Sequence, residues 1–211
     1  MQELNIGRDS TVALPPPKKN RTLTRVLVPF AVIGGFVVLC LLVVVVRFYR
    51  AHPYEDFRAF STPSGSMCPT ICEHDRLIAA TDAYEKVGPR RGDLIIFKSQ
   101  LSGALFTKRI IGVGGDTVSR SVDGAILVNG KRVELPPLCG KPRASPVATS
   151  SLRFERVTVP ANSFFVVGDN LENSYDSRIE GFGFVASDSI RAKPLVLYWS
   201  PDRSRIGCDL R

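Results

Sequence analysis

Ser66 lies in a run of small residues that could expose a nucleophile. The run PSGSMCPT, residues 63–70, joins prolines, a glycine, two serines and a threonine. This composition favours turns over a helix or a core strand. A serine hydroxyl becomes a strong nucleophile only where a neighbouring base takes its proton. The run therefore predicts either an ordinary turn or a nucleophile held on a tight loop, and the identity of the base decides between them.

Histidine is the usual base, and the chain has two, His52 and His74. His52 follows a long apolar segment. His74 stands in CEHDRL, among charged residues that we expect to be solvated. Neither position favours a buried base beside Ser66.

A lysine can serve as the base where burial lowers its pKa. Most lysines in the chain sit in polar runs, but Lys108 stands in the apolar stretch ALFTKRIIGVGG. Strand alternation places Phe106 and Ile110 on its face and Arg109 on the other. Its spacing alone favours a surface lysine at a sheet edge, so a catalytic role needs support from another segment.

That support comes from GDNLENSYDSR, residues 168–178, which follows the apolar strand SFFVV. By itself the stretch could be a turn, or a loop of oxygen ligands for calcium. Asp176 and Arg178 could pair and brace the loop. It would then present Ser174, whose hydroxyl could orient a lysine amine.

The elements that must position these residues are predicted to be short strands. Past residue 58 no long helical period occurs, and Asn129-Gly130 is a strong hairpin signal. Short strands between Gly and Pro turns predict a mainly β barrel or sandwich. We expect residues 135–151, LPPLCGKPRASPVATSS, to form a surface loop or small flap. The expected strands lie within residues 75–81, 92–97, 105–113, 124–135, 154–159, 163–169 and 194–199.

Residues 26–46 carry no charge and match the roughly 20 residues that cross a bilayer. A buried core helix is rarely apolar all round, and a cleavable signal peptide has a shorter apolar part that ends in small residues. We therefore expect an uncleaved transmembrane anchor helix. More Lys and Arg precede it than follow it, so residues 1–25 should be a disordered cytoplasmic tail and residues 47–211 should lie outside.

The net charge of +8 indicates that the protein is attracted to an anionic partner. The sequence has no aromatic-basic cluster and no recognition helix, which disfavours nucleic acid as a partner. Attraction to anionic lipid headgroups is the expected consequence of the charge.

The cysteines indicate an oxidising compartment if that orientation holds, with one or two disulfides whose pairing is open. Cys40, in the apolar span, is expected to pack. Cys68, Cys72 and His74 also suggest zinc, but their spacing matches no common zinc pattern. The cysteines expected outside are Cys68, Cys72, Cys139 and Cys208.

Four stretches resemble, in the same order, the boxes of bacterial type I signal peptidases: PSGSMCPT, RRGDLIIF, TKRIIGVGGD and GDNLENSYDSR. The resemblance implies two antiparallel β-sheet domains behind an N-terminal transmembrane helix, with a small inserted β subdomain at about 117–160. It implies a serine endopeptidase of the inner membrane, with its catalytic domain in the periplasm and no metal or organic cofactor. Such an enzyme removes signal peptides from exported preproteins and cleaves after small residues.

The resemblance also implies roles for individual residues. Ser66 would be the nucleophile and Lys108 the general base, with Ser64 and the Ser66 amide as the oxyanion hole. Ser174 would hydrogen-bond to Lys108. The supporting residues would be Asp176, Arg178, Gly168, Asp169 and Asn170. The substrate pocket would be lined by Phe60, Thr62, Met67 and Thr107.

Some positions depart from the family pattern. Gly114 replaces a usual proline. Thr62 and Thr107 replace usual aliphatic residues, which predicts roomier pockets unless their hydroxyls bond nearby backbone. A rim of Phe57, Phe60 and Met67 could reach the lipid surface or could be ordinary core packing.

Three other functions compete with general signal-peptide removal. One is a dedicated processing peptidase of a conjugation or secretion system on the same fold. Another is a non-catalytic, anchored β-domain that binds a surface partner. A self-cleaving repressor is disfavoured by the apolar span and by the lack of a DNA-binding domain.

Overall fold

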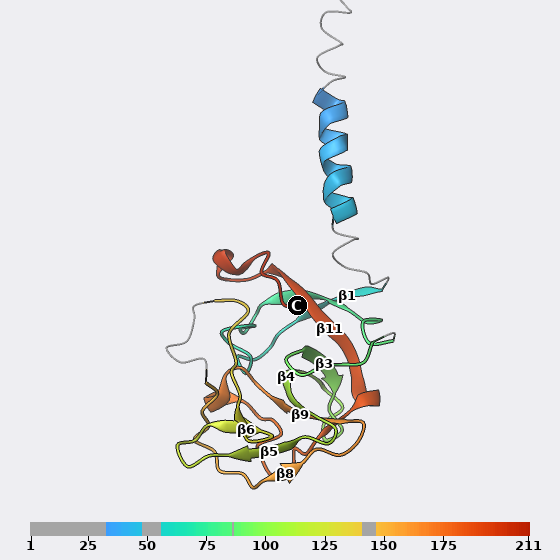
Figure 1. Ribbon diagram of the computed structural model, residues 1–211. Helices are drawn as coiled ribbons and strands as arrows, with labels where there is room; N and C mark the ends of the chain where they lie inside the picture. The colour runs from blue at the N-terminus through green and yellow to red at the C-terminus, as the bar shows by residue number, and fades with distance from the viewer. Residues whose placement is uncertain (1–32, 48–55, 86, 141–146) are drawn as a thin grey trace, which may run out of the picture. The chain divides into compact units, whose positions relative to one another are not determined.

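The computed structural model describes residues 33–47, 56–85, 87–140 and 147–211 (Figure 1). The chain divides into two compact units, Met1–Pro53 and Tyr54–Arg211. In the first, residues 33–47 are helical and exposed. Among the described residues, no helix has the length and apolarity that a membrane crossing requires. The expected anchor, residues 26–46, begins outside the described residues. His52 and the predicted tail, residues 1–25, lie wholly outside them.

The unit Tyr54–Arg211 is mainly β and contains two antiparallel sheets, which confirms the predicted class. The larger sheet has the strand order β1-β2-β11-β3-β4-β9-β10. Its strands are β1 (Phe57–Ser61), β2 (Arg76–Ala80), β3 (Leu94–Lys98), β4 (Leu105–Val113), β9 (Ser163–Val167), β10 (Val185–Ala186) and β11 (Ile190–Trp199).

The smaller sheet has the order β7-β6-β5-β8, and Figure 1 shows it at the end of the unit away from β1. Its strands are β5 (Thr117–Arg120), β6 (Ile126–Val128), β7 (Lys131–Arg132) and β8 (Val157–Thr158). Asn129 and Gly130 have φ of 52° and 77° and join β6 to β7. These angles suit a two-residue hairpin turn, so the predicted hairpin is confirmed.

Three 3-10 helices complete the unit: η1 (Leu171–Asn173), η2 (Ser187–Ser189) and η3 (Arg203–Arg205). The strand β11 links the two halves of the larger sheet, because it pairs with β3 near Ala192 and with β2 from Lys193 onward. Irregularities in its register let this one strand serve both partners.

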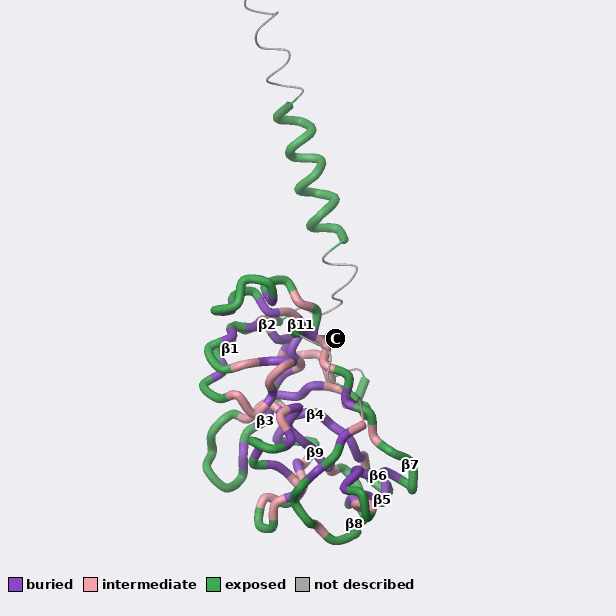
Figure 2. Tube along the Cα trace, turned by 90° about the vertical axis from the view of Figure 1, so that its left-hand side faces the viewer, coloured by how far each residue is buried: buried purple, intermediate pink, exposed green. Residues whose placement is uncertain are grey.

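The central strands are buried on both faces, as Figure 2 shows for β3, β4 and β9. In β3, Leu94 and Ile96 belong to one core cluster and Ile95 and Phe97 to another. A continuous apolar run is expected for a strand that is covered on both sides. The Lys108 segment of β4 pairs directly with this strand, Lys108 opposite Ile95.

Two expectations about packing need correction. Met67 is 3% exposed and belongs to the core cluster of Ile71 and Leu77, so it is not part of a lipid-facing rim. The segment 135–151 is not simply a surface loop. Leu135 and Cys139 near its start and Ala148 and Ser150 near its end are buried. Its C-terminal part bridges to neighbouring segments, through Val147 to Glu134 and through Thr149 to Ala125.

Candidate active site

Ser66 sits on a tightly bonded loop, residues 63–75, which we call the Ser66 loop. Its turn is closed by hydrogen bonds from the Cys68 amide to the Gly65 carbonyl (3.1 Å) and from the Ile71 amide to the Met67 carbonyl (2.9 Å). A disulfide joins Cys68 to Cys72. Met67 packs into the core while Ser66 stays partly exposed. The small residues thus hold a reachable hydroxyl on a fixed turn.

Lys108 meets Ser66 directly. Its Nζ donates a hydrogen bond to Ser66 Oγ at 2.8 Å and lies 5.7 Å from the centre of the Phe106 ring. The lysine is 4% exposed, so it is not a surface residue at a sheet edge. The contact brings together the two residues that the sequence analysis paired as nucleophile and base.

Burial lowers the pKa of Lys108 to about 8. Removing water from the amine disfavours its charged form, and the charge of Arg178 lowers the pKa further. Asp176 and Asp169 act in the opposite sense but do not cancel the effect of burial. An amine with this pKa is neutral in a substantial fraction of molecules near pH 8 and can accept a proton.

Ser64 stands on the same loop, and its Oγ donates a hydrogen bond to Ser66 Oγ at 3.3 Å. Its hydroxyl therefore lies close to the Ser66 hydroxyl.

The 168–178 loop holds the Ser66 loop from the other side. Asn170 donates from its backbone amide to the Ser66 carbonyl and from its side chain to the Gly65 carbonyl, each at 3.0 Å. Gly168 lies against Ser66 so closely that a Cβ at this position would overlap the Ser66 carbonyl and the Ser174 hydroxyl. The glycine is needed for this close approach.

Ser174 differs from its predicted arrangement. Its Oγ is buried beside Gly168 and has no hydrogen-bond partner among the residues that the structure describes. The hydrogen bond to Lys108 that the resemblance implies is thus not formed in this structure.

Two buried ion pairs brace the same region. Asp176 and Arg178 pair as expected, with Arg178 Nε donating to Asp176 Oδ1 at 2.8 Å, and Asp176 also accepts the Gly168 amide at 2.9 Å. Asp169 pairs with Arg109 at 2.5 Å and accepts a hydrogen bond from the Thr70 hydroxyl. Arg109 therefore ties β4, the Ser66 loop and the 168–178 loop together, directly beside Lys108.

A groove of about 450 Å³ opens over Ser66 and Lys108, and we call it the Ser66 groove. All four predicted pocket residues line it: Phe60, Thr62, Met67 and Thr107. The Thr62 hydroxyl lies within hydrogen-bond distance of two backbone carbonyl oxygens, those of Cys72 (2.7 Å) and Asp75 (2.8 Å), and can donate its proton to either. This contact matches the alternative in which the hydroxyl of Thr62 bonds nearby backbone and leaves the pocket unchanged.

The groove contains residues that the sequence reasoning missed. Ile96 and Leu105 come from β3 and β4, and Asn173 and Tyr175 come from the 168–178 loop. The alternation of β3 and β4 could have indicated the first two. Arg109 was the other omission, and its place beside Lys108 in the sequence was the available signal.

The competing base and metal assignments do not fit. The His74 side chain is 73% exposed and lies 3.9 Å from Glu73, with a φ of 67° that turns it outward on the loop. The disulfide between Cys68 and Cys72 removes the free thiolates that zinc would need. A second disulfide joins Cys139 to Cys208, which settles the pairing that the sequence left open.

The chain is similar to known proteins. A family model described as "Signal peptidase, peptidase S26" matches residues 30–199. The chain is 36% identical over 149 residues to Signal peptidase I of Leptolyngbya laminosa, which covers 67% of this chain and 68% of that protein. It is 34% identical over 147 residues to Probable signal peptidase I-2 of Synechocystis, and spans 62% of that protein's length and 67% of its own.

Two further relatives are a sequence and a solved structure. Signal peptidase I U of Bacillus subtilis is 34% identical over 146 residues, covering 67% of this chain and 76% of that protein. The crystal structure of a signal peptidase I from Enterococcus faecalis is 31% identical with a TM-score of 0.38, covering 50% of this chain and 95% of that one. On the match over residues 30–199 and these identities, the chain belongs to the signal peptidase family S26 and is a serine peptidase, a hydrolase.

Proposed function

We propose that this protein is a membrane-anchored endopeptidase that removes N-terminal signal peptides from exported preproteins with a Ser66/Lys108 dyad. The observation that carries the proposal is the 2.8 Å contact between Lys108 Nζ and Ser66 Oγ. It joins a reachable hydroxyl to a buried amine whose pKa is lowered to about 8. A base must lie within hydrogen-bond reach of the proton it takes, and its pKa should lie near the working pH.

The reaction begins when neutral Lys108 accepts the Ser66 proton and Ser66 Oγ attacks the scissile carbonyl carbon. The carbonyl oxygen takes up negative charge in the tetrahedral intermediate. When the peptide C–N bond breaks, the leaving amine takes the proton from Lys108, and the signal peptide remains as an ester on Ser66. Water then gives a proton to Lys108 and attacks the ester carbonyl carbon. When the ester bond breaks, Lys108 returns that proton to Ser66 Oγ, and the signal peptide leaves as a carboxylic acid.

Ser64 and the Ser66 amide are the proposed donors to the developing oxyanion. The Ser64 hydroxyl lies 3.3 Å from Ser66 Oγ and can turn from it to the oxyanion when substrate binds. Removing one donor of this kind typically costs about 10²- to 10³-fold in kcat.

Ser174 is proposed to orient Lys108 during the reaction. Its buried Oγ has no hydrogen-bond partner among the described residues, so the hydroxyl is available to the amine. Neutral Lys108 would gain a partner that keeps its lone pair directed at Ser66.

The Ser66 groove is the proposed binding site for the residues before the scissile bond. Its walls include Phe60, Met67 and Ile96, and its volume is about 450 Å³. We expect these apolar walls to favour small residues next to the cleaved bond. Residues 105–108 of β4 pair with β3 but not with β9, so the backbone at Thr107 would pair with an extended substrate on that open side.

The apolar segment 26–46 is proposed to anchor the enzyme with residues 47–211 outside the cytoplasm. Both disulfides support this orientation, because disulfides persist mainly in oxidising compartments. Protease added to intact spheroplasts should degrade residues 47–211. Protection of that region would reverse the orientation.

The function is tested by incubating the detergent-solubilised protein with a panel of preproteins. Wild type should release each signal peptide, while Ser66→Ala and Lys108→Ala should each lose about 10³-fold or more and the double variant no more than either alone. His74→Ala is the control and should retain activity. Turnover that survives Lys108→Ala would refute the dyad, and cleavage of only one preprotein would indicate a dedicated peptidase.

A further inference from the structure

Arg205 is a buried arginine with no place in the chemistry described so far. It lies in η3 near the C-terminus and is 7% exposed, whereas its neighbours Arg203 and Ser204 are exposed. The short helix therefore turns one cation inward. Burying a charge is unfavourable unless partners surround it, so the contacts of this side chain indicate its purpose.

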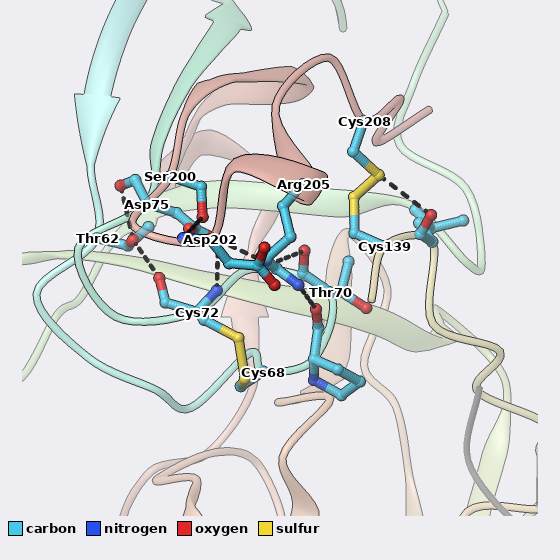
Figure 3. Close-up of polar contacts among 12 residues, drawn as sticks. Thr62, Cys68, Thr70, Cys72, Asp75, Cys139, Ser200, Asp202, Arg205 and Cys208 are labelled. Atoms are coloured by element: carbon cyan, nitrogen blue, oxygen red, sulfur yellow. Dashed lines mark hydrogen bonds and ion pairs between the residues drawn. A yellow bond between two sulfur atoms is a disulfide. The ribbon is translucent and has the colours of Figure 1, made fainter. Parts of the chain in front are cut away.

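The Arg205 guanidinium binds the Ser66 loop at three places, which Figure 3 shows together. Its Nη1 donates to the Pro69 carbonyl at 2.6 Å, and its Nη2 donates to the Thr70 carbonyl at 3.0 Å and to Asp75 Oδ2 at 2.7 Å. The same Asp75 oxygen accepts the Cys72 amide at 2.8 Å. One side chain thus holds the part of the loop that begins three residues after Ser66.

The anchorage of η3 is itself firm. Asp202 accepts the Ser204 amide at 3.0 Å, and the Gly207 amide donates to the Leu197 carbonyl at 2.7 Å. The Cys139–Cys208 disulfide fastens the next residues to a segment 69 residues away in the sequence. Figure 3 shows this disulfide beside Arg205.

Gly140, next to that disulfide, closes over the contact. Its φ is +81°, and a Cβ here would lie 2.9 Å from Arg205 Nη1 and 3.0 Å from the Pro69 carbonyl oxygen. The backbone of this segment can cover the arginine only because the residue has no side chain. The Gly140 backbone therefore packs directly against the contact between Arg205 and Pro69.

The contact leads directly to the dyad. Thr70, whose carbonyl Arg205 holds, donates its hydroxyl to Asp169, and Asp169 pairs with Arg109 beside Lys108. The loop is thus held from the C-terminal side by Arg205 and from the Lys108 side by Asp169. A displacement of about 1 Å in a reacting group can cost about 10²-fold in rate.

We propose that Arg205 is a positioning residue that sets Ser66 Oγ against Lys108 Nζ from the C-terminal end of the chain. This proposal rests on the proposed function of Ser66 and Lys108. Arg205 acts through the Ser66 loop, because its guanidinium donates hydrogen bonds to Pro69, Thr70 and Asp75 of that loop.

The test compares Arg205→Met and Arg205→Lys with wild type, using Arg203→Met as the matched control because Arg203 is exposed on the same turn. Rates are divided by the folded fraction, which near-ultraviolet circular dichroism measures at a temperature well below each midpoint. For Arg205→Met we expect kcat per folded molecule to fall by about 10²-fold with KM changed by less than about threefold. Arg205→Lys keeps a cation but loses the two guanidinium nitrogens that bond the loop together, so its kcat should lie between those of Arg205→Met and wild type. The control Arg203→Met should have the wild-type kcat.

A second readout separates this proposal from the proposed function. Acylation of Ser66 by p-nitrophenyl acetate, with Ser66→Ala as the blank, needs the dyad but no preprotein. If wild type is acylated and fails to cleave preproteins, the proposed function is wrong while Arg205 is still tested by this reaction. Arg205→Met should slow the acylation by a factor similar to its loss of kcat. Wild-type acylation and kcat per folded Arg205→Met molecule would overturn the proposal and leave Arg205 a purely structural residue.

Discussion

Lys108 Nζ and Ser66 Oγ lie 2.8 Å apart although 42 residues separate them in the sequence. Lys108 is carried by β4 and Ser66 by a turn that is held on two sides, by Asn170 and by Arg205 through Pro69 and Thr70. The contact is therefore a product of the fold around it. Its consequences reach stability as well as catalysis.

Keeping Lys108 buried should destabilise the protein at neutral pH. Its pKa is about 8 in the folded state against 10.5 for the free group, so the unfolded chain binds more protons between these values. The free energy of unfolding therefore rises between about pH 8 and about pH 10.5. The full destabilisation by the buried lysine is present below about pH 8. Since one pKa unit corresponds to 1.36 kcal/mol and the two pKa values differ by about 2.5, we expect Lys108→Met to raise the free energy of unfolding by about 3 kcal/mol at pH 7.

Urea unfolding of the detergent-solubilised wild type and Lys108→Met at pH 7 and pH 10.5 measures this difference. The advantage of the variant should shrink at the higher pH, because the lysine is then neutral in the folded state and already half neutral in the unfolded state. If Lys108→Met is less stable than wild type at pH 7, burial of Lys108 does not destabilise the folded protein.

Gly168→Ala should inactivate the enzyme while leaving most of the β structure in place. The added Cβ would overlap the Ser66 carbonyl and the Ser174 hydroxyl, so the Ser66 loop must move away. We expect kcat to fall by about 10²-fold or more, as displacement of a reacting group predicts. Gly88→Ala is the control, since nothing lies within 4 Å of a Cβ there. Preprotein cleavage at the wild-type rate by Gly168→Ala would mean that the two loops do not need this approach.

The two disulfides should differ in how much they stabilise the fold. The Cys139–Cys208 bond spans 69 residues and the Cys68–Cys72 bond spans four. Loop-closure entropy then predicts losses of about 4 and about 2 kcal/mol for the respective double Cys→Ala variants. Chemical unfolding with matched protein concentrations ranks them. An equal loss for both variants would be inconsistent with the entropic account.

Several parts of this architecture were predictable because they depend on local sequence. Alternation along residues 105–113 indicated that Lys108 and Arg109 face opposite sides, and Asn129-Gly130 indicated the β6–β7 hairpin. The strands β1 and β5 were missed, since FRAFS and TVSR are short and show little apolar patterning. They exist because β2 and β6 offer them a partner.

Contacts between distant segments could not be predicted in this way. The pair Arg109–Asp169 joins positions 60 apart, and Arg205 reaches Pro69 across 136 residues. Four cysteines allow three pairings, and the choice depends on where η3 docks. The resemblance identified the residues of the reaction, but it gave no sign of Arg205.

Thr62 and Thr107 should differ in their effect on specificity. The Thr62 hydroxyl bonds the backbone, with two carbonyl oxygens in reach of its proton, so Thr62→Ile should destabilise the Ser66 loop and leave unchanged which substrate residues are accepted. Thr107 is partly exposed in the Ser66 groove, so Thr107→Ile should fill part of the groove and reduce the range of substrate residues that are cleaved. One methylene in an apolar pocket changes the discrimination between substrates by about 1–3 kcal/mol. Cleavage of a preprotein library, read by mass spectrometry, compares the profiles. A profile that changes in Thr62→Ile and stays unchanged in Thr107→Ile would contradict this prediction and would make Thr62 the threonine that determines specificity.

The dependence of kcat/KM on pH tests the central claim most directly, because the account requires Lys108 to be neutral when it takes the Ser66 proton. The pKa of about 8 predicts that kcat/KM rises tenfold per pH unit below about 7, bends near pH 8 and is level by about pH 9. The same curve should be seen in His74→Ala, since that imidazole is exposed. A rate that bends near pH 6.5, the ordinary value for histidine, or that still rises steeply at pH 10 would contradict the account.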